Sequence, residues 1–250
     1  MVDIAESPVP DHAVLPDLRR RDVGTILVSP WLVGDLERQR AAVDATLAGY
    51  DHFGLPDGFL SLSCFVSVEG TTVVYYAQWT SDEAHREFQR TDRPALARGV
   101  DELVPGIERP GVTRYRLYRD YLPAGDTPGP AACVVLVTVT FETPGRAHGW
   151  VDSVIEAMRA ADPVPGLISN YFHVSVSDTR VLNYAEWTDA AAHRAAVESG
   201  LGPIGRHGRH GADGRHGADG PRFREMPGVV DIAVERCQLY RSLRSHRRVA

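Results

Sequence analysis

Two polar side chains share one face of an apolar segment in the second half of the chain. Successive side chains of a β-strand point to opposite faces, so Asn183, Ala185 and Trp187 lie on one face of the strand predicted over residues 181–187. The small Ala185 leaves a slot between the amide and the indole about as wide as an aromatic ring. A buried amide without a hydrogen-bond partner costs about 1–3 kcal/mol. The pattern therefore indicates either a ligand site or a structural cross-strand hydrogen bond.

A histidine on the preceding strand joins this group if the turn between the strands has an odd number of residues. With a turn centred on Asp178, His173 lies opposite Asn183 and Tyr171 lies near Ala185. A neutral imidazole is a suitable general base near pH 7, and the amide and the indole are hydrogen-bond donors. With an even number of turn residues, His173 falls on the other face and leaves the group.

The same residues also have structural interpretations. Trp79 and Trp187 could close the junction between strand and helix as core aromatics, and His193 could lie idle at the start of a helix. No carboxylate or thiol stands at ligand-like spacing from His173 and His193, because Glu186 points to the opposite face. The sequence therefore predicts no metal site.

The segment that contains Asn183 occurs twice in the chain, which indicates a tandem duplication. The matching pairs are YAQWTSDEAHR at 76–86 with YAEWTDAAAHR at 184–194, and the PG and LYR motifs over 105–119 with those over 227–241. The second copy is longer because of an insertion rich in Gly, His and Arg at about 205–220, in which a GRHGAD unit occurs twice. Such a stretch has little to bury, so a mobile surface loop is expected.

Each copy is predicted to have the element order βαββαβ, from its apolar strands, helically spaced apolar residues and turn signals. Such a unit forms a four-stranded antiparallel sheet with both helices on one face, which leaves the other face apolar. We therefore expect an α+β protein of two ferredoxin-like repeats whose antiparallel sheets pack face to face. The expected boundaries are a flexible N-terminal arm at 1–22, a first domain at 23–121, a linker at 122–131, a second domain at 132–243 and a basic tail at 244–250.

Composition and charge exclude several classes of protein. The chain is 43% hydrophobic and 24% charged, which is too apolar for a disordered protein. Its formal net charge of -6 argues against nucleic-acid binding, and no apolar run reaches the ~18–20 residues that cross a bilayer. No signal-peptide pattern is present, so a cytoplasmic protein is expected. All 27 basic residues are arginine, which removes Schiff-base chemistry and the P-loop lysine.

The strands around the two tryptophans resemble those of the antibiotic biosynthesis monooxygenase family of the dimeric α+β barrel superfamily. The likeness rests on VLNYAEWT at 181–188 after YFHVS at 171–175, and on VVYYAQWT at 73–80, so it covers both copies. It implies an intramolecular dimeric α+β barrel. Relatives include quinone-forming oxygenases, polyketide cyclases and haem-degrading enzymes, so the fold alone does not fix the activity.

The resemblance also implies roles for particular residues. In the quinone-forming relatives, an Asn and a Trp on this strand support oxygenation of an aromatic polyketide without flavin, haem or metal. The implied catalytic residues are His173, Asn183 and Trp187, and the implied substrate contacts are Tyr171, His193, Trp79 and Arg98. His193 stands where the family has a tyrosine, and Arg98 matches a pocket arginine of the family. The first copy has Phe65 and Tyr75 in place of His and Asn, and it is expected to lack the activity.

The sequence thus predicts a cofactor-independent monooxygenase, active in its second copy, that oxidises an anthrone or phenol intermediate of aromatic polyketide tailoring to a quinone. Molecular oxygen is the co-substrate, and no other cofactor is implied. Three alternatives stay open: a polyketide cyclase or other non-oxidative tailoring enzyme, a haem-binding relative, and a non-catalytic binding module. The expected partner is a small aromatic polyketide, with neither nucleic acid nor membrane. The chain is expected to be a monomer with an internal pseudo-dimer, or a homodimer.

Overall fold

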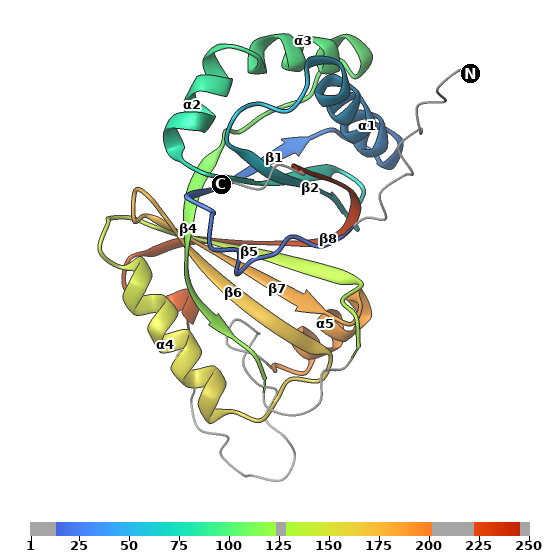
Figure 1. Cartoon of the computed structure of the whole chain (residues 1–250). Helices are drawn as coiled ribbons and strands as arrows, with labels where there is room; N and C mark the ends of the chain where they lie inside the picture. The colour runs from blue at the N-terminus through green and yellow to red at the C-terminus, as the bar shows by residue number, and fades with distance from the viewer. Residues whose placement is uncertain (1–13, 124–128, 202–222, 246–250) are drawn as a thin grey trace, which may run out of the picture. The chain divides into compact units, whose positions relative to one another are not determined.

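The computed structural model describes residues 14–123, 129–201 and 223–245, which form an α+β structure with antiparallel strands. The predicted insertion at 205–220 lies outside the described residues, as do the outer parts of the predicted arm, linker and tail. The described residues contain eight strands and five α-helices, and they divide into two compact units (Figure 1). Unit 1 comprises residues up to 66, 70–112 and those from 239 on, and unit 2 comprises 67–69 and 113–238.

Unit 1 has three helices on one face of its sheet (Figure 1). The strand order is β1-β3-β2-β8, in which only the end of β8 (Val229–Arg244) from Leu239 belongs to this unit. Helix α3 (Arg93–Leu103) is not predicted by the sequence. Pro94 is in its first turn, where a backbone N–H has no partner within the helix and its absence costs nothing. The elements are β1 (Thr25–Leu32), α1 (Leu36–Phe53), β2 (Phe59–Ser67), β3 (Thr72–Trp79), α2 (Asp82–Arg90) and α3 (Arg93–Leu103).

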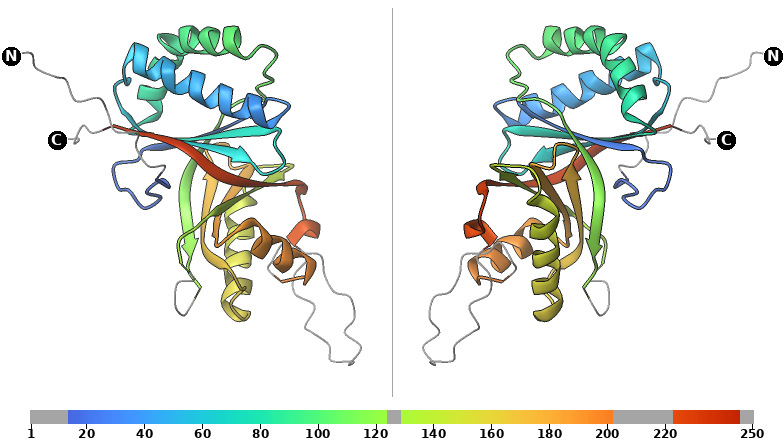
Figure 2. Two further views of the ribbon diagram at one scale, coloured as in Figure 1. Left: turned by 90° about the vertical axis from the view of Figure 1, so that its right-hand side faces the viewer. Right: turned by 90° about the vertical axis from the view of Figure 1, so that its left-hand side faces the viewer.

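Unit 2 has helices α4 and α5 on the same face of a sheet ordered β8-β5-β7-β6-β4 (Figure 2). Its core lies between that face and the helices, and it includes the buried Trp150 of α4 and Phe172 of β6. The elements are β4 (Thr113–Tyr121), β5 (Cys133–Phe141), α4 (Ala147–Ala160), β6 (Leu167–Ser175), β7 (Arg180–Trp187), α5 (Ala190–Glu198), the 3-10 helix η1 (Phe223–Glu225) and β8 (Val229–Arg244).

The last strand of each predicted copy crosses the predicted domain boundaries. β4 belongs to unit 2, where Leu117 pairs with His173 of β6. β8 pairs with β5 in unit 2, with Val134 opposite Cys237, and its end continues into unit 1 beside β2. An edge strand has unpaired N–H and C=O groups, and an added strand satisfies them. The compact units therefore differ from the predicted domains at 23–121 and 132–243.

The order strand–helix–strand–strand–helix–strand occurs twice along the chain, as the sequence predicts, with α3 as an addition in the first half. The face-to-face packing of the two sheets stays a prediction. Residues 14–22 of the predicted arm pack against unit 1, where Leu18 is buried. There Gln78 Nε2 donates to Asp17 O at 2.7 Å, and Arg244 donates to Leu15 O at 2.6 Å.

A glycine before β6 places helix α5 on the sheet of unit 2. Gly166 has a φ of 83°, and its carbonyl accepts a hydrogen bond from Thr188 N at 2.9 Å. A Cβ at this position would lie 2.6 Å from Ala192 Cβ, in the first turn of α5. Only glycine permits both the left-handed backbone and this close approach. His193 is the next residue of α5, so the contact also sets its position.

We expect Gly166→Ala to destabilise the fold more than Gly145→Ala. Gly145 also has a positive φ of 88°, but a Cβ there would meet no atom within 4 Å. Both variants bear the left-handed strain of about 1–2 kcal/mol, and only Gly166→Ala adds an overpacking cost of about 1–3 kcal/mol. The free energies of unfolding from denaturant titrations test this. Equal losses in the two variants would show that α5 does not depend on the close approach.

Candidate functional site

Unit 2 contains a cavity of about 260 Å³ between its sheet and helices α4 and α5. Two rows of paired residues across the sheet form its floor. One row is Arg236, Val135, Ala185 and Asn170, and the next contributes Val234, Val137 and Asn183. The small Ala185 lies between polar side chains at this floor, as the sequence predicts. Most of the remaining lining is apolar, from α4, α5 and the segments that follow them.

Two asparagines form a pair at the cavity wall. Asn183 Nδ2 donates to Asn170 Oδ1 at 3.0 Å, and the two residues are only 6% and 2% exposed. Asn183 Oδ1 and Asn170 Nδ2 have no hydrogen-bond partner among the described residues. If both side-chain amides are turned over, one NH2 group still donates to one carbonyl oxygen. The other NH2 group and the other oxygen then stay without a partner. The pair thus satisfies the buried amide in part and keeps hydrogen-bonding capacity for a ligand.

Trp187 adds a second unpaired donor to this wall. Its side chain shares the face of Asn183 and Ala185, and the residue is 7% exposed. Its ring meets the imidazole of His193 edge-on, with centroids 4.9 Å apart. Within the described part of the chain, Trp187 Nε1 has no acceptor. A buried indole N–H is usually paired, so this donor favours a ligand with an oxygen atom in the cavity.

His193 is a neutral donor held by an arginine. Arg236 Nε donates to His193 Nδ1 at 2.9 Å, which places the ring proton on Nε2. Burial, and then the positive charge of Arg236, lower the pKa of His193 to about 4. Arg236 in turn lies 3.4 Å from the carboxylate of Glu69. The imidazole therefore stays uncharged at neutral pH, and its only free ring nitrogen carries a proton.

The structure does not place His173 in this cavity. Six residues separate Val174 and Val181, the last pair before the turn. As a result, His173 pairs with Leu182, and Phe172 lies opposite Asn183. The turn therefore has an even number of residues, and the expected juxtaposition of His173 and Asn183 is wrong. His173 is fully buried on the other face, and this burial lowers its pKa to about 4.

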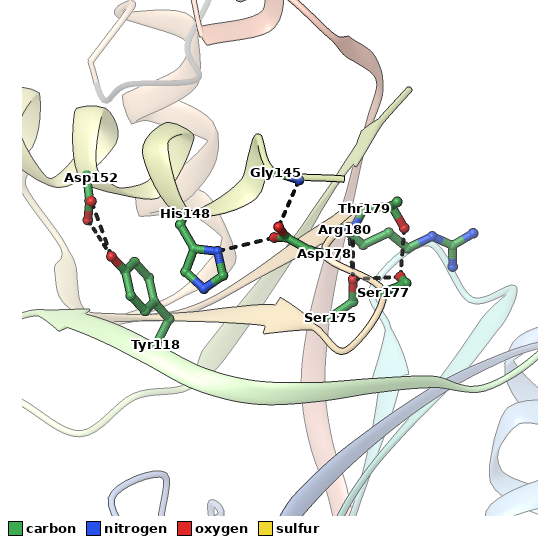
Figure 3. A network of polar contacts seen from close by, with 9 residues as sticks. All are labelled: Tyr118, Gly145, His148, Asp152, Ser175, Ser177, Asp178, Thr179 and Arg180. Atoms are coloured by element: carbon green, nitrogen blue, oxygen red, sulfur yellow. Dashed lines mark hydrogen bonds and ion pairs between the residues drawn. The ribbon is translucent and has the colours of Figure 1, made fainter. Parts of the chain in front are cut away.

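The conformation of the turn explains this register (Figure 3). Asp178 has a φ of 55°, a left-handed conformation that aspartate tolerates better than most residues, and its N–H donates to Ser175 O at 2.8 Å. Ser175 Oγ accepts from Arg180 N at 3.0 Å. The Asp178 carboxylate accepts from Gly145 N at 2.8 Å and lies 3.2 Å from His148 Nδ1. These contacts anchor the turn to the residues around the start of α4.

Tyr171 leaves the predicted group for the same reason. It pairs with Tyr184 on the face opposite the cavity, with ring centroids 6.4 Å apart. Asn170 takes its place opposite Ala185. The sequence signal for Asn170 was its polar type within an apolar strand, but its face depended on the turn length. Arg236 was also missed, because it reaches the cavity only through the pairing of β5 with β8.

Comparison with known proteins finds the fold but no close relative. No family model matches the chain, and no curated protein matches it. An anthrone oxidase-like protein superposes with a TM-score of 0.61 at 13% identity, over 90% of this chain and 95% of the other. A candidate monooxygenase from Fusobacterium nucleatum gives a TM-score of 0.52 at 9% identity, over 89% and 95% of the two chains. The chain has the fold of these proteins.

At these identities the likeness shows a shared fold and no more. A monooxygenase from the ActVA-Orf6 gene of Streptomyces coelicolor, solved with nanaomycin D, also matches. It is 28% identical over 44% of this chain and 100% of its own, with a TM-score of 0.37. The fold supports many functions, so the activity has to be argued from the cavity.

The residues predicted in the first copy lie in unit 1. Trp79 lines a cavity of about 240 Å³ and contacts His85 edge-on, with centroids 5.2 Å apart. Tyr75, at the position of Asn183, donates its hydroxyl to Ala42 O at 3.2 Å and pairs with Thr46 at 2.9 Å. A cavity thus remains in the first copy beside its bulkier side chains.

Arg98 does not reach this cavity. It is exposed on α3, two residues from each of the buried Leu96 and Val100, and side chains two apart on a helix do not share a face. The arginines that line the cavity are Arg93 and Arg109.

Among the described residues, no group of three or more His, Cys, Asp or Glu side chains is arranged to hold a metal ion. No helix in that part of the chain is both long and apolar enough to cross a membrane.

The amide pair leads to a stability prediction that tests the hydrogen bond between the two asparagines. We expect Asn183→Leu and Asn170→Leu each to lower the free energy of unfolding by about 1–3 kcal/mol, because each leaves the other amide without its partner. The double variant Asn170→Leu/Asn183→Leu is expected to regain most of this loss, since no unpaired amide remains. Denaturant titrations of the four proteins measure the effect. Additive losses in the double variant would contradict the pairing.

Proposed function

We propose that the cavity of unit 2 binds an aromatic polyketide intermediate and supports its oxidation by O₂ to a quinone without a bound cofactor. The observation behind this proposal is the set of three buried polar atoms, Asn170 Nδ2, Asn183 Oδ1 and Trp187 Nε1, that have no partner among the described residues. They lie on the wall of a mainly apolar cavity. Unpaired buried groups are costly, at about 1–3 kcal/mol each, unless a ligand pairs them. The fold shared with an anthrone oxidase-like protein supports the proposal by analogy.

An anthrone supplies its own electrons once it becomes an enolate. Loss of a proton from its methylene carbon gives the enolate, which transfers an electron to O₂. Recombination forms a carbon–oxygen bond and, after protonation, a hydroperoxide. Loss of water from the hydroperoxide breaks the O–O bond and leaves a carbonyl. One anthrone and one O₂ thus give one quinone and one water, and the four electrons that reduce O₂ come from the substrate.

The proposed contribution of the protein is to favour the enolate over the neutral substrate. Trp187 Nε1 and Asn170 Nδ2 donate to the enolate oxygen, and Asn183 Oδ1 accepts from a substrate hydroxyl. The positive charge of Arg236 lies on the same floor and favours an anion further. In a largely apolar cavity such preorganised donors stabilise developing charge more than water does, at about 2.7–4 kcal/mol for one donor.

The cavity supplies donors rather than a general base. No carboxylate is among the described residues that line it. His193 has Nδ1 occupied by Arg236 and a proton on Nε2. The substrate proton therefore passes to solvent, and the chain acts by lowering the pKa of the substrate. The general-base role expected of His173 is not part of this proposal, because His173 lies on the other face of the sheet.

An aldol-type cyclisation, like the oxidation, begins with loss of a proton from carbon, so the requirement for O₂ is what separates the two reactions. The cyclase and the non-catalytic binding module are therefore outcomes of the test rather than second proposals.

The relationship between the two halves of the chain is also part of what we propose. We infer a tandem duplication of ferredoxin-like repeats that acts as a monomer with an internal pseudo-dimer. The repeated element order supports it. Gly58 supports it as well. It has a positive φ of 77°, and a Cβ there would lie 2.5 Å from Ala84 Cβ, just as a Cβ at Gly166 would lie close to Ala192 Cβ. Both glycines precede the second strand of their half and contact the start of its second helix.

We expect the purified protein to convert an anthrone to the quinone in air and to give no product without oxygen. Trp187→Phe keeps the ring and removes the unpaired donor, so kcat is expected to fall about 10²-fold. The matched control is Trp150→Phe, which also removes a buried indole N–H in unit 2 but one that is bonded to Phe223 O at 3.1 Å, outside the cavity. Its activity per folded molecule is expected to stay unchanged.

Absorbance of the quinone and consumption of O₂ measure the reaction. Turnover without oxygen would favour a non-oxidative enzyme, and binding without turnover would favour a binding module. An unchanged rate in Trp187→Phe would contradict the role given to the indole. Each of these results counts against the proposal.

A further inference from the structure

The cavity of unit 1 differs in chemistry from that of unit 2. Its wall is formed largely by aromatic and aliphatic side chains, namely Leu27, Leu62, Tyr75, Ala77, Trp79 and Phe88. Two arginines, Arg93 and Arg109, also line it, and no carboxylate is among its described lining residues. It therefore combines an apolar volume for a ring with positive charge at its edge.

Both arginines lie close to the same indole. The guanidinium carbon of Arg109 lies 4.2 Å from the centroid of the Trp31 ring, and that of Arg93 lies 5.6 Å from it. Trp31 is itself fixed by Ser29, which accepts from its Nε1 at 3.1 Å, and by an edge contact with Tyr75. Guanidinium groups are attracted to an aromatic face, so Trp31 holds the two like charges near each other.

The backbone around Arg109 is also anchored. Leu32 N donates to Glu108 O at 2.9 Å, and Glu108 N donates to Leu32 O at 3.1 Å. This bridge ties the segment before β4 to the end of β1, one residue from Trp31. The position of Arg109 beside Trp31 is therefore set by the fold rather than by a flexible loop.

The positive charge at this edge is only partly balanced. Arg109 donates to Asp101 at 2.6 Å, a pair in which the Asp101 side chain is 47% exposed. Arg109 Nε is buried and has no partner among the described residues. Within the same residues Arg93 makes no ion pair. Burial, and then the charge of Arg109, lower the pKa of Arg93. An anion between the two guanidinium groups would relieve this repulsion and pair the free donors.

We propose that the cavity of unit 1 binds a planar aromatic carboxylate, with the carboxylate held by Arg93 and Arg109 and the ring against Trp79 and Phe88. The site is independent of the oxidation proposed for unit 2, because it uses none of the same residues. It gives the first half of the chain a ligand of its own in place of a lost activity.

The test uses 2-naphthoate and its neutral analogue naphthalene-2-carboxamide as probes in calorimetric titrations of the whole chain. We expect naphthoate to bind at least about tenfold more tightly than the carboxamide, and high salt to weaken only the naphthoate. Equal affinities of the two probes, or no binding of naphthoate, would overturn the proposal. This comparison needs no variant, so it holds even where a substitution prevents folding.

Variants then locate the site. Arg93→Gln and Arg109→Gln are each expected to raise the Kd of naphthoate about tenfold. The matched control Arg98→Gln, on the same helix as Arg93 but exposed and outside the cavity, is expected to leave the Kd unchanged. Naphthoate binding that survives Arg93→Gln and Arg109→Gln but is lost in Arg236→Gln would place the probe in unit 2 and overturn the proposal.

Discussion

The register of β6 on β7 determines which side chains share the cavity of unit 2. It is set by a turn of six residues between Val174 and Val181, in which Asp178 adopts a left-handed conformation. A shift of one residue would move every side chain of β6 to the other face and exchange Asn170 for Tyr171. The first half of the chain has the same turn length between Val66 and Val73, with Gly70 at a φ of 85°. The amide pair and the cavity floor both depend on this constraint.

The two cavities differ in how they handle charge. In unit 2, where the exposed Arg224 also lines the cavity, the guanidinium of Arg236 lies between the carboxylate of Glu69 and the neutral ring of His193. Its charge is partly balanced, and it orients a donor toward an apolar volume. In unit 1 two guanidinium groups lie close to the Trp31 ring, and the one carboxylate among the described residues that pairs with either of them is that of Asp101, with Arg109. The first arrangement suits an anion that forms during a reaction, and the second suits a ligand that is already charged.

Local patterns were sufficient to predict part of this structure. Strand alternation predicted that Asn183, Ala185 and Trp187 share a face, and their pairing with alternate residues of β5 confirms it. The order of elements followed from the same patterns. The parity of the turn could not be predicted, because the residues from Ser175 to Arg180 are compatible with an odd or an even turn and the left-handed Asp178 decides between them.

Long-range pairing accounts for most of what the sequence did not show. Arg236 reaches the cavity because β8 pairs with β5 about a hundred residues earlier, and β4 joins β6 rather than staying with its own copy. The resemblance implies Arg98 as the pocket arginine, whereas the arginine of the same helix that lines the cavity is Arg93. These errors arise from contacts between distant segments, which single-sequence patterns do not encode.

The central claim is that the cavity of unit 2 favours the ionised form of an aromatic hydroxyl compound. The most direct measurement is the pKa of bound 2-naphthol, followed by its absorbance, in a protein whose unit 1 cavity is disabled by Arg93→Gln and Arg109→Gln. We expect the bound naphthol to have a pKa below that of free naphthol, by at least about one unit, and this pKa to return toward the free value when Trp187→Phe is added. A pKa of the bound compound equal to or above that of the free compound would contradict it.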